Sequence, residues 1–545
     1  MSQGKFDAVS LSIMWERLVS IADEGATTLI RTSFSTLVRE GYDLSVMLFD
    51  AAGNMIAQST KCIPVFIGTA PVTMSHMLRK FGTADLHPGD VVISNDPVIG
   101  TGHMYDIAVM RPIFIRGRAV AFAMSITHLP DIGGMGFSAA ATEIYHEGLR
   151  LPICKLFEAG QVDDMLVELI RMNVRVPEQV IGDIMAGVSC TDVVAGNVID
   201  FMREYALDGL DELSRLIRGQ TEQAVRDSLR AIPDAVYENA FDAEAIDDPV
   251  RLACRIDKSG DSMLIDFAGT GPCVRSGINV PICYSRSMAL YAVKCLTTPS
   301  VPNNDGATSR ITVTAPRHCI LNAEAPMPSA GRHIIGHFVV PLIFGALAAA
   351  LPDRITADSG LLNIITFQGR LRTGEPFAAT YFAAGGFGAL SGLDGQPTTP
   401  GSSNMACTPT EVFEDLTGIT ILRKALRCDS GGAGDFRGGP GQEIVMRNDT
   451  GHPLVVFSMA NRTEFPARGA FGGQPGALRE HHIDGKAISP KGRHELAPGG
   501  LLTILEAGGG GYGQTSSRSK ERIRDDMRRG FLSAEQAKRV YGLLS

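Results

Sequence analysis

The sequence has a single tryptophan, few aromatic residues (6%) and ten cysteines that are scattered singly along 545 residues. No two cysteines have CxxC spacing, which argues against zinc ribbons and thioredoxin-type redox chemistry. The N-terminal residues MSQGKFDAVSLSIMWERL carry charges where a secretory signal would be apolar. We therefore expect a cytoplasmic protein whose cysteines are reduced thiols.

Long apolar runs and basic blocks are absent as well. The longest apolar run, Phe338 to Leu351, covers about 14 residues and contains Pro341, whereas a membrane span needs roughly 20 residues. The net charge of −9, with no basic block, argues against nucleic acid or an anionic membrane as the main partner. The composition, 44% hydrophobic and 20% charged, is that of a soluble globular protein.

Nucleotide-binding motifs are missing too. The sequence contains no GxxxxGK[ST] and no GxSxG. Gly508, Gly510 and Gly513 match GxGxxG after an expected strand, Leu501 to Leu505, but only about 30 residues follow, too few for a second parallel strand. We therefore expect any nucleotide chemistry to come from another chain.

Two histidines, His333 and His337, lie four residues apart on one face of an expected helix. The residues between them include no glutamate, so the HExxH motif of zincins is excluded. For this pair we favour buried core or polar-cap roles over a metal-ligand role.

The chain is too long for one hydrophobic core, which predicts two to four domains. We predict a multi-domain α+β fold with mixed β-sheets, a helical central segment and a glycine-rich, β-dominated C-terminal part. The expected parts are an α/β region with the candidate metal site (1–160), a helical segment (161–235), an α+β region (236–430) and a glycine-rich β region with short C-terminal helices (431–545).

The segment from Asn95 to Asp131 contains the main candidate site. A glycine-containing loop is followed by two β-rich runs, Ile107 to Ile115 and Arg118 to Thr127. The short connection Arg116-Gly117 between them predicts an antiparallel hairpin.

This hairpin predicts a cluster of two histidines and a carboxylate. Counting outward from the turn places Asp106 opposite Thr127, so His103, Asp106 and His128 gather at the open end, where cross-strand neighbours are about 4.5–5.5 Å apart. Pro112 indicates an edge or a bulge that would shift this register by one. The three side chains suit a divalent metal such as Mn, Fe or Zn. The alternative, hydrogen-bonded structural histidines at strand ends, remains open at this point.

Several segments together resemble the B subunit of the hydantoinase/5-oxoprolinase family: GDVVISNDPVIGTGHMYD, THLPDIGG, EGLRLP, DSGGAGDFRGGPG and GGGGYG…YG. The resemblance covers essentially the whole chain and extends to the large subunits of acetone and acetophenone carboxylases. It implies a hetero-oligomer with a hydantoinase A-type subunit, which binds ATP with Mg and phosphorylates a carbonyl or lactam oxygen. The B subunit then completes the reaction.

The resemblance also implies site residues. In the carboxylase relatives a His-x-x-Asp pair and a later histidine hold a divalent metal; in this chain these are His103, Asp106 and His128. Two segments depart from the usual pattern: PVHLG is replaced by PVFIG at 64–68, and GGTH by GTGH at 100–103. Both departures concern the substrate more than the architecture.

The expected function is ATP-dependent hydrolysis of a cyclic amide such as a hydantoin, oxoproline or a lactam, with the metal activating water. Asp131 is a catalytic candidate that would orient a histidine or accept a proton. Glu147 is a second candidate if it lines the same cleft; pairing with Arg150 is its structural alternative.

Three other functions remain open. The first is a carboxylase subunit acting on a ketone, although EGLRLP and the chain length favour the hydantoinases. The second is a non-catalytic scaffold that docks the ATP-binding chain. An iron oxygenase fits the ligand set but not the His-x-x-Asp spacing.

Overall fold

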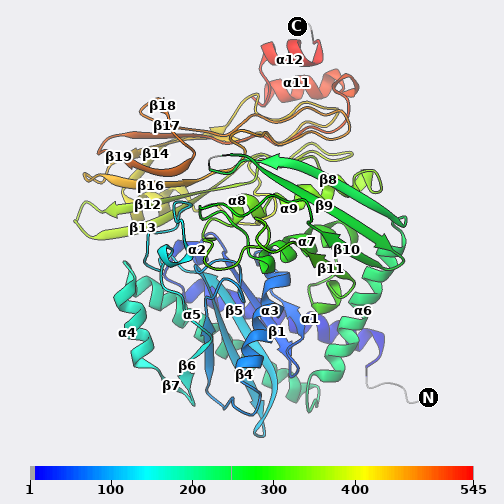
Figure 1. The fold of residues 1–545 in the computed structure, drawn as a ribbon, viewed down its shortest axis with the longest axis vertical. Helices are drawn as coiled ribbons and strands as arrows, with labels where there is room; N and C mark the ends of the chain where they lie inside the picture. The colour runs from blue at the N-terminus through cyan, green and yellow to red at the C-terminus, as the bar shows by residue number, and fades with distance from the viewer. Residues whose placement is uncertain (1–5, 247, 544–545) are drawn as a thin grey trace.

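The computed structural model describes residues 6–246 and 248–543. The described strands form four β-sheets, which helices cover and connect (Figure 1). One sheet contains a parallel pair of strands and the others are antiparallel. The predicted multi-domain α+β fold with mixed sheets is confirmed.

The described helices are α1 (Ala8–Thr32), α2 (Thr36–Arg39), α3 (Phe66–Lys80), α4 (Asp164–Asn173), α5 (Pro177–Glu204), α6 (Asp211–Arg230), α7 (Ile282–Thr297), α8 (His333–Gly336), α9 (Val339–Leu347), α10 (Thr410–Thr417), α11 (Lys520–Arg528) and α12 (Ala534–Tyr541). The described strands are β1 (Leu44–Asp50), β2 (Met55–Gln58), β3 (Val91–Ser94), β4 (Asp106–Ile115), β5 (Arg118–His128), β6 (Cys154–Glu158), β7 (Gln161–Val162), β8 (Ala235–Ala243), β9 (Val250–Ser259), β10 (Ser262–Asp266), β11 (Ile311–Thr314), β12 (Leu362–Arg370), β13 (Pro376–Ala384), β14 (Ile419–Leu426), β15 (Gln442–Asn448), β16 (Leu454–Met459), β17 (Glu480–Ile483), β18 (Lys486–Ala487), β19 (Lys491–Leu496) and β20 (Leu501–Leu505).

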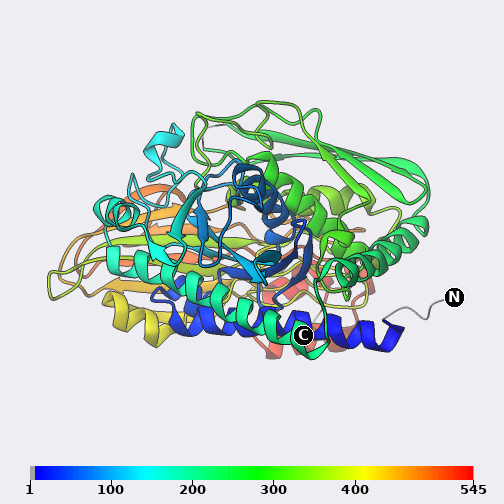
Figure 2. The same ribbon diagram turned by 90° about the horizontal axis from the view of Figure 1, so that it is seen from below.

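The first sheet has the strand order β2-β1-β5-β4-β3-β6-β7, and its central strands are buried on both faces. Side chains alternate along β1: Val46 and Leu48 join the core formed with α1 and α5, whereas Met47 and Phe49 join the core that contains α3. This two-residue period follows from strand geometry. α1 and α5 pack side by side along one face of the sheet (Figure 2).

Strands β4 and β5 form the predicted hairpin in the middle of this sheet. Ile115 pairs with Arg118 across the two-residue turn, as predicted. Arg116 and Gly117 both have positive φ, 50° and 78°. Positive φ at both central residues is the conformation of a tight hairpin turn.

The predicted register is wrong by one residue at the open end of the hairpin. Asp106 pairs with His128 rather than with Thr127, because the register shifts between Ile113 and Phe114. A β-bulge of this kind places one extra residue on one strand. The shift brings Asp106 directly opposite a candidate metal ligand.

Helix α5 is long and apolar enough to cross a membrane when only length and composition are considered. In the structure it packs against α1, β4 and β5, and Cys190, Val194 and Val198 are buried in the core that also contains Val46. These contacts are those of a core helix in a folded domain. Together with α4 and α6 it forms the helical segment between the first and second sheets.

The strands of the remaining three sheets all lie after residue 234. The second has the order β11-β10-β9-β8 and packs on α9, the third has the order β13-β12-β16-β19, and the fourth has the order β14-β15-β20-β17-β18. The third and fourth each combine strands from before and after residue 430. The proposed four-part division of the chain stays a prediction.

Glycines in the C-terminal third pack backbone against backbone. A Cβ on Gly386 would lie 1.7 Å from the carbonyl oxygen of Gly439, and one on Gly508 would lie 1.7 Å from that of Ser430. The same segments exchange main-chain hydrogen bonds, for example from Gly509 N to Gly439 O at 2.9 Å. The GxGxxG segment therefore lies within a packed layer of main chain, where a larger residue does not fit.

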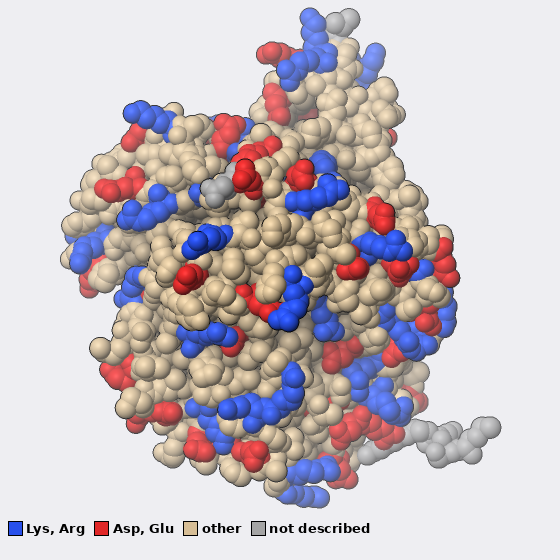
Figure 3. Space-filling view, in the orientation of Figure 1, with Lys and Arg blue, Asp and Glu red and all other residues tan. Residues whose placement is uncertain are grey.

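Charged side chains of both signs are interspersed over the face shown in Figure 3.

Candidate metal centre

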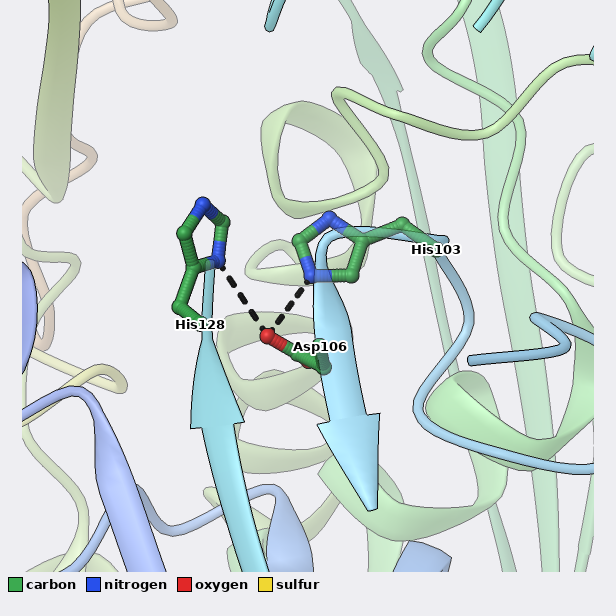
Figure 4. A group of neighbouring side chains, drawn as sticks. All are labelled: His103, Asp106 and His128. Atoms are coloured by element: carbon green, nitrogen blue, oxygen red, sulfur yellow. Dashed lines mark hydrogen bonds and ion pairs between the residues drawn. The ribbon is translucent and has the colours of Figure 1, made fainter. Parts of the chain in front are cut away.

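Asp106 and His128 meet because Asp106 begins β4, His128 ends β5 and the two residues are paired. His103 lies in the loop three residues before Asp106. Both imidazoles point at one oxygen of the Asp106 carboxylate (Figure 4). His103 Nε2 lies 2.9 Å and His128 Nδ1 lies 3.2 Å from Asp106 Oδ1. The structure thus brings together the three residues that the sequence predicted as metal ligands.

A hydrogen bond from His103 Nδ1 determines which ring nitrogen carries the proton. Nδ1 donates to the carbonyl oxygen of Ala330 at 3.1 Å, so in the neutral ring Nε2 carries the lone pair. Burial, followed by the charge of Arg332, lowers the pKa of His103 to about 4, so the ring is neutral at pH 7. A lone pair then faces a carboxylate oxygen, an arrangement that a cation between them would stabilise.

The protonation states of His103 and Asp106 suit metal binding. Burial alone would raise the pKa of Asp106, but His103 and Arg332 outweigh burial and hold that pKa well below its usual range. A metal binds an ionised carboxylate and neutral imidazoles. The three donor atoms lie within 4.8 Å of one another on buried side chains. Two nitrogens and an oxygen fit Zn, Mn or Fe, with positions left for water or substrate.

Asp43 is a site residue that the sequence did not reveal. It precedes β1, and β1 pairs with β5 starting at Leu44 opposite Thr127. This pairing places Asp43 Oδ2 3.6 Å from His128 Nδ1. Burial raises the pKa of Asp43 to about 6. No local motif marks the residue, because its position depends on a pairing between strands far apart in the sequence.

Arg332 holds the other side of the Asp106 carboxylate. Its Nη2 donates to Asp106 Oδ2 at 2.9 Å, and its Nε donates to the Thr101 carbonyl at 2.7 Å. The guanidinium lies over the Tyr284 ring, 4.4 Å from the ring centre. A Cβ on Gly102 would lie 2.7 Å from the Arg332 side chain, so glycine lets the loop approach it. These contacts turn Oδ1 of Asp106 toward the histidines.

Asp131, predicted as a base or as a partner of a histidine, is buried but has other partners. Its Oδ1 accepts from the Gly133 N–H at 3.1 Å and from the Arg175 guanidinium at 2.6 Å. Its Oδ2 accepts from the Arg175 backbone N–H. The carboxylate therefore ties the loop after β5 to the segment before α5. Its catalytic role stays a prediction, and these contacts favour a structural one.

Glu147 reaches the centre through one peptide group. Its Oε1 accepts from the N–H of Ala330 and from the N–H of the residue before it, both at 2.6 Å. The Ala330 carbonyl in turn accepts from His103. Burial raises the pKa of Glu147 to about 7, even though those two N–H groups lower it. Arg150, the alternative partner, pairs with Asp96 instead.

A cavity of about 50 Å³ lies against these residues. His333 and His337 are buried, as expected, but they also line this cavity. Its walls are formed by Asp43, Ile63, Val65, Phe66, His103, Asp106, His128, Phe137, Tyr284, Arg332, His333, His337, Leu362, Ile364, Ser403 and Met405. The wall therefore combines residues from the first sheet, α7, α8 and the third sheet.

The structure is therefore a large α+β fold with a buried cluster of two histidines and one aspartate at the end of a hairpin. The sequence pattern of the hydantoinase B/oxoprolinase family matches residues 7–515, so the chain belongs to that family.

One curated relative and two solved structures are similar to this chain over nearly its whole length. The caprolactamase subunit beta of Pseudomonas jessenii is 27% identical over 99% of this chain and 96% of its own length. The crystal structure of the ATP-dependent caprolactamase from Pseudomonas jessenii has a TM-score of 0.91 at 25% identity and covers 99% of this chain and 97% of its own. A nucleotide-free acetone carboxylase structure has a TM-score of 0.89 at 19% identity, covering 99% of this chain and 80% of its own. At that identity the last likeness shows the fold alone.

Proposed function

We propose that this chain is the metal-dependent, hydrolytic subunit of an ATP-dependent cyclic amide hydrolase. The observation that carries the proposal is the convergence of His103 Nε2 and His128 Nδ1 on Asp106 Oδ1 beside a buried cavity. Membership of the hydantoinase B/oxoprolinase family supports the class of reaction.

His103, Asp106 and His128 would hold the ion, and Asp43 is placed to add a fourth donor. A bound divalent ion would lower the pKa of water and polarise an amide oxygen. Arg332 keeps the Asp106 carboxylate oriented, and Glu147 keeps the Ala330 carbonyl in place against His103. The chain's residues thus hold the ion and orient its ligands.

ATP would come from a hydantoinase A-type partner with Mg, because the sequence has no P-loop. That chain would phosphorylate the amide oxygen and so make its carbon more electrophilic. The caprolactamase relative is named as a subunit beta, which supports a hetero-oligomer. We infer a cytoplasmic enzyme that acts on a small molecule, without nucleic acid or membrane as a partner.

A ketone carboxylase subunit is the second candidate, supported by the likeness in fold to acetone carboxylase. The hydrolase is favoured because this chain covers 97% of the caprolactamase chain but 80% of the acetone carboxylase chain.

The test is an assay of the chain together with its A-type partner and ATP. Hydantoin, 5-oxoproline, caprolactam, and acetone with bicarbonate are offered in turn, with wild type beside His128→Ala and the control His452→Ala, a half-buried residue before β16. Hydrolysis of a cyclic amide that only His128→Ala abolishes supports the proposal. Carboxylation of acetone alone would favour the second candidate. Undiminished activity in His128→Ala would leave a scaffold role.

A further inference from the structure

His333 and His337 are buried, yet ring nitrogens on both lack protein partners. The residues are 4% and 3% exposed. Neither nitrogen of His333, nor Nδ1 of His337, makes a hydrogen bond within the described part of the chain. The backbone of Met459 favours the protonated form of His333 but does not reach hydrogen-bonding geometry. Because native proteins pair most buried polar atoms, a bound molecule or water is the expected partner.

The two rings line the same cavity as the candidate metal centre. Residues four apart on a helical turn share a face, and the ring centres of His333 and His337 are 5.8 Å apart. Both line the cavity that His103 and His128 also line. The Phe137 ring lies between the two groups, 4.9 Å from the His128 ring centre and 6.2 Å from that of His333. A small molecule in the cavity would therefore meet the centre on one side and this pair on the other.

The chemistry of the pair suits an uncharged polar group. Burial, followed by the charge of Arg332, lowers the pKa of His337 to about 3, so its ring stays uncharged. A neutral imidazole offers one N–H donor and one acceptor nitrogen. Other parts of the wall are apolar: Phe66, Leu362, Ile364 and Met405. Donors and acceptors without charge, set in an apolar wall, match an amide group better than a free anion.

We propose that His333 and His337 bind the amide group of the substrate and hold it against the metal centre. In the intact amide, one imidazole N–H donates to the oxygen and one ring nitrogen accepts from the N–H; once the oxygen is phosphorylated and the nitrogen has lost its proton, an imidazole N–H donates to that nitrogen. This inference rests on the proposed function, which supplies the cyclic amide. The cavity of about 50 Å³ has roughly the volume of one to two waters, so it takes the reacting end of the molecule.

The experiment uses the full-length chain and two readouts, neither of which is enzyme activity. The variants His333→Phe and His337→Phe keep a flat ring without nitrogens, His337→Asn restores a donor and an acceptor, and His452→Phe is the control. Metal content is measured by elemental analysis after metal-replete purification. The Kd for 2-pyrrolidinone, a simple lactam, is measured by isothermal titration calorimetry.

We expect wild-type metal content in every variant. The Kd should rise roughly tenfold or more in His333→Phe and His337→Phe, because each loses hydrogen bonds to a buried ligand. His337→Asn should stay within about threefold of wild type, because an amide side chain keeps both functions. The control should match wild type in both readouts. If a Phe variant fails to fold, His333→Leu replaces it, with the same expected loss.

Three results would overturn the inference. Loss of metal from the Phe variants would make the pair metal ligands. An unchanged Kd in both, with metal retained, would make them packing residues whose nitrogens face water. A wild-type chain with no measurable affinity for 2-pyrrolidinone would show that the pair does not bind an amide. Absence of metal from wild type would instead count against the proposed function. That failure is distinguishable, because the calorimetric Kd reports on His333 and His337 and the elemental analysis reports on the metal.

Discussion

Two buried histidines, His333 and His481, lie in different surroundings. Both ring nitrogens of His481 have partners: Nδ1 faces Ser458 Oγ at 3.2 Å, and Nε2 faces Asn363 Nδ2 at 3.0 Å. Neither nitrogen of His333 has one in the described part of the chain. The contrast separates a polar cluster that serves the fold from one that is open toward a cavity.

The cluster around His481, in the C-terminal half, is closed by an ion pair. Arg479 and Glu506 are fully buried and 2.7 Å apart. The Arg479 guanidinium also donates to the carbonyl oxygens of Gly360, Leu361 and Asn461. The charge of Arg479 is thus fully paired within the protein. In the cluster of His103, Asp106 and His128, by contrast, two imidazoles converge on one carboxylate oxygen beside a cavity.

The largest expected effect comes from removing a side chain from the cluster of His103, Asp106 and His128. His128→Ala should lower turnover by on the order of 10³-fold or more, because under the proposed function the variant would lose the ion that polarises the substrate. Turnover is measured with the A-type partner and ATP. His482→Ala, at a half-buried position in β17, should retain turnover. Equal losses in both variants would mean that the cluster has no special role.

The glycine layer tests how tightly the C-terminal half is closed. Gly386→Ala should destabilise the protein by about 4 kcal/mol or more, because the new Cβ would meet the Gly439 carbonyl oxygen at 1.7 Å. Gly196→Ala, in α5 with no atom within 4 Å of the new Cβ, should be neutral or slightly stabilising. Urea denaturation measures both. A mild effect at Gly386 would show that the layer can separate easily.

Breaking the ion pair tests the closed cluster itself. Arg479→Met should lower the free energy of unfolding by about 3–5 kcal/mol, because Glu506 would be left buried and unpaired. Arg447→Met removes a more exposed partner of Asp449 and should change stability little. Metal content should be unaffected in either folded variant. Metal loss from Arg479→Met would couple the two clusters, against this account.

The smallest effect concerns the pH dependence of stability. Glu147, with a pKa of about 7 in the folded state against its ordinary value of 4.5, keeps its proton to a higher pH when folded. Its contribution to stability is therefore present below pH 4.5 and is lost as the pH rises through 7, by roughly 3 kcal/mol. Glu147→Gln, which still accepts both N–H groups, should lose less stability over this range. Equal slopes in denaturation series would contradict the burial argument.

Local sequence predicted the hairpin and the meeting of His103, Asp106 and His128, because a two-residue turn and strand alternation fix which residues come together. The simple count from the turn was wrong by one residue at the open end because of the bulge at Ile113/Phe114, directly after Pro112, the residue that indicated an edge or a bulge. The conclusion survived that error, since a shift of one residue keeps all three side chains at the same end of the hairpin.

The rest of the site depends on long-range contacts that no short pattern contains. Asp43 joins it through the pairing of β1 with β5, and His333 joins it because the segment just before α8 is hydrogen-bonded to the loop before β4. The expected core role of His333 followed from its helical spacing alone. The glycine-rich segments of the C-terminal third likewise pack main chain against main chain between distant segments, which no local pattern reveals.

The central claim is that the hairpin cluster holds a divalent metal, and elemental analysis tests it most directly. Wild type, His103→Ala, Asp106→Asn and His128→Ala are purified with Mn, Zn and Fe supplied and then freed of loose ions. The account predicts close to one metal ion per wild-type chain and a large loss in each variant. A wild-type chain without metal, or variants that keep the full amount, would contradict it.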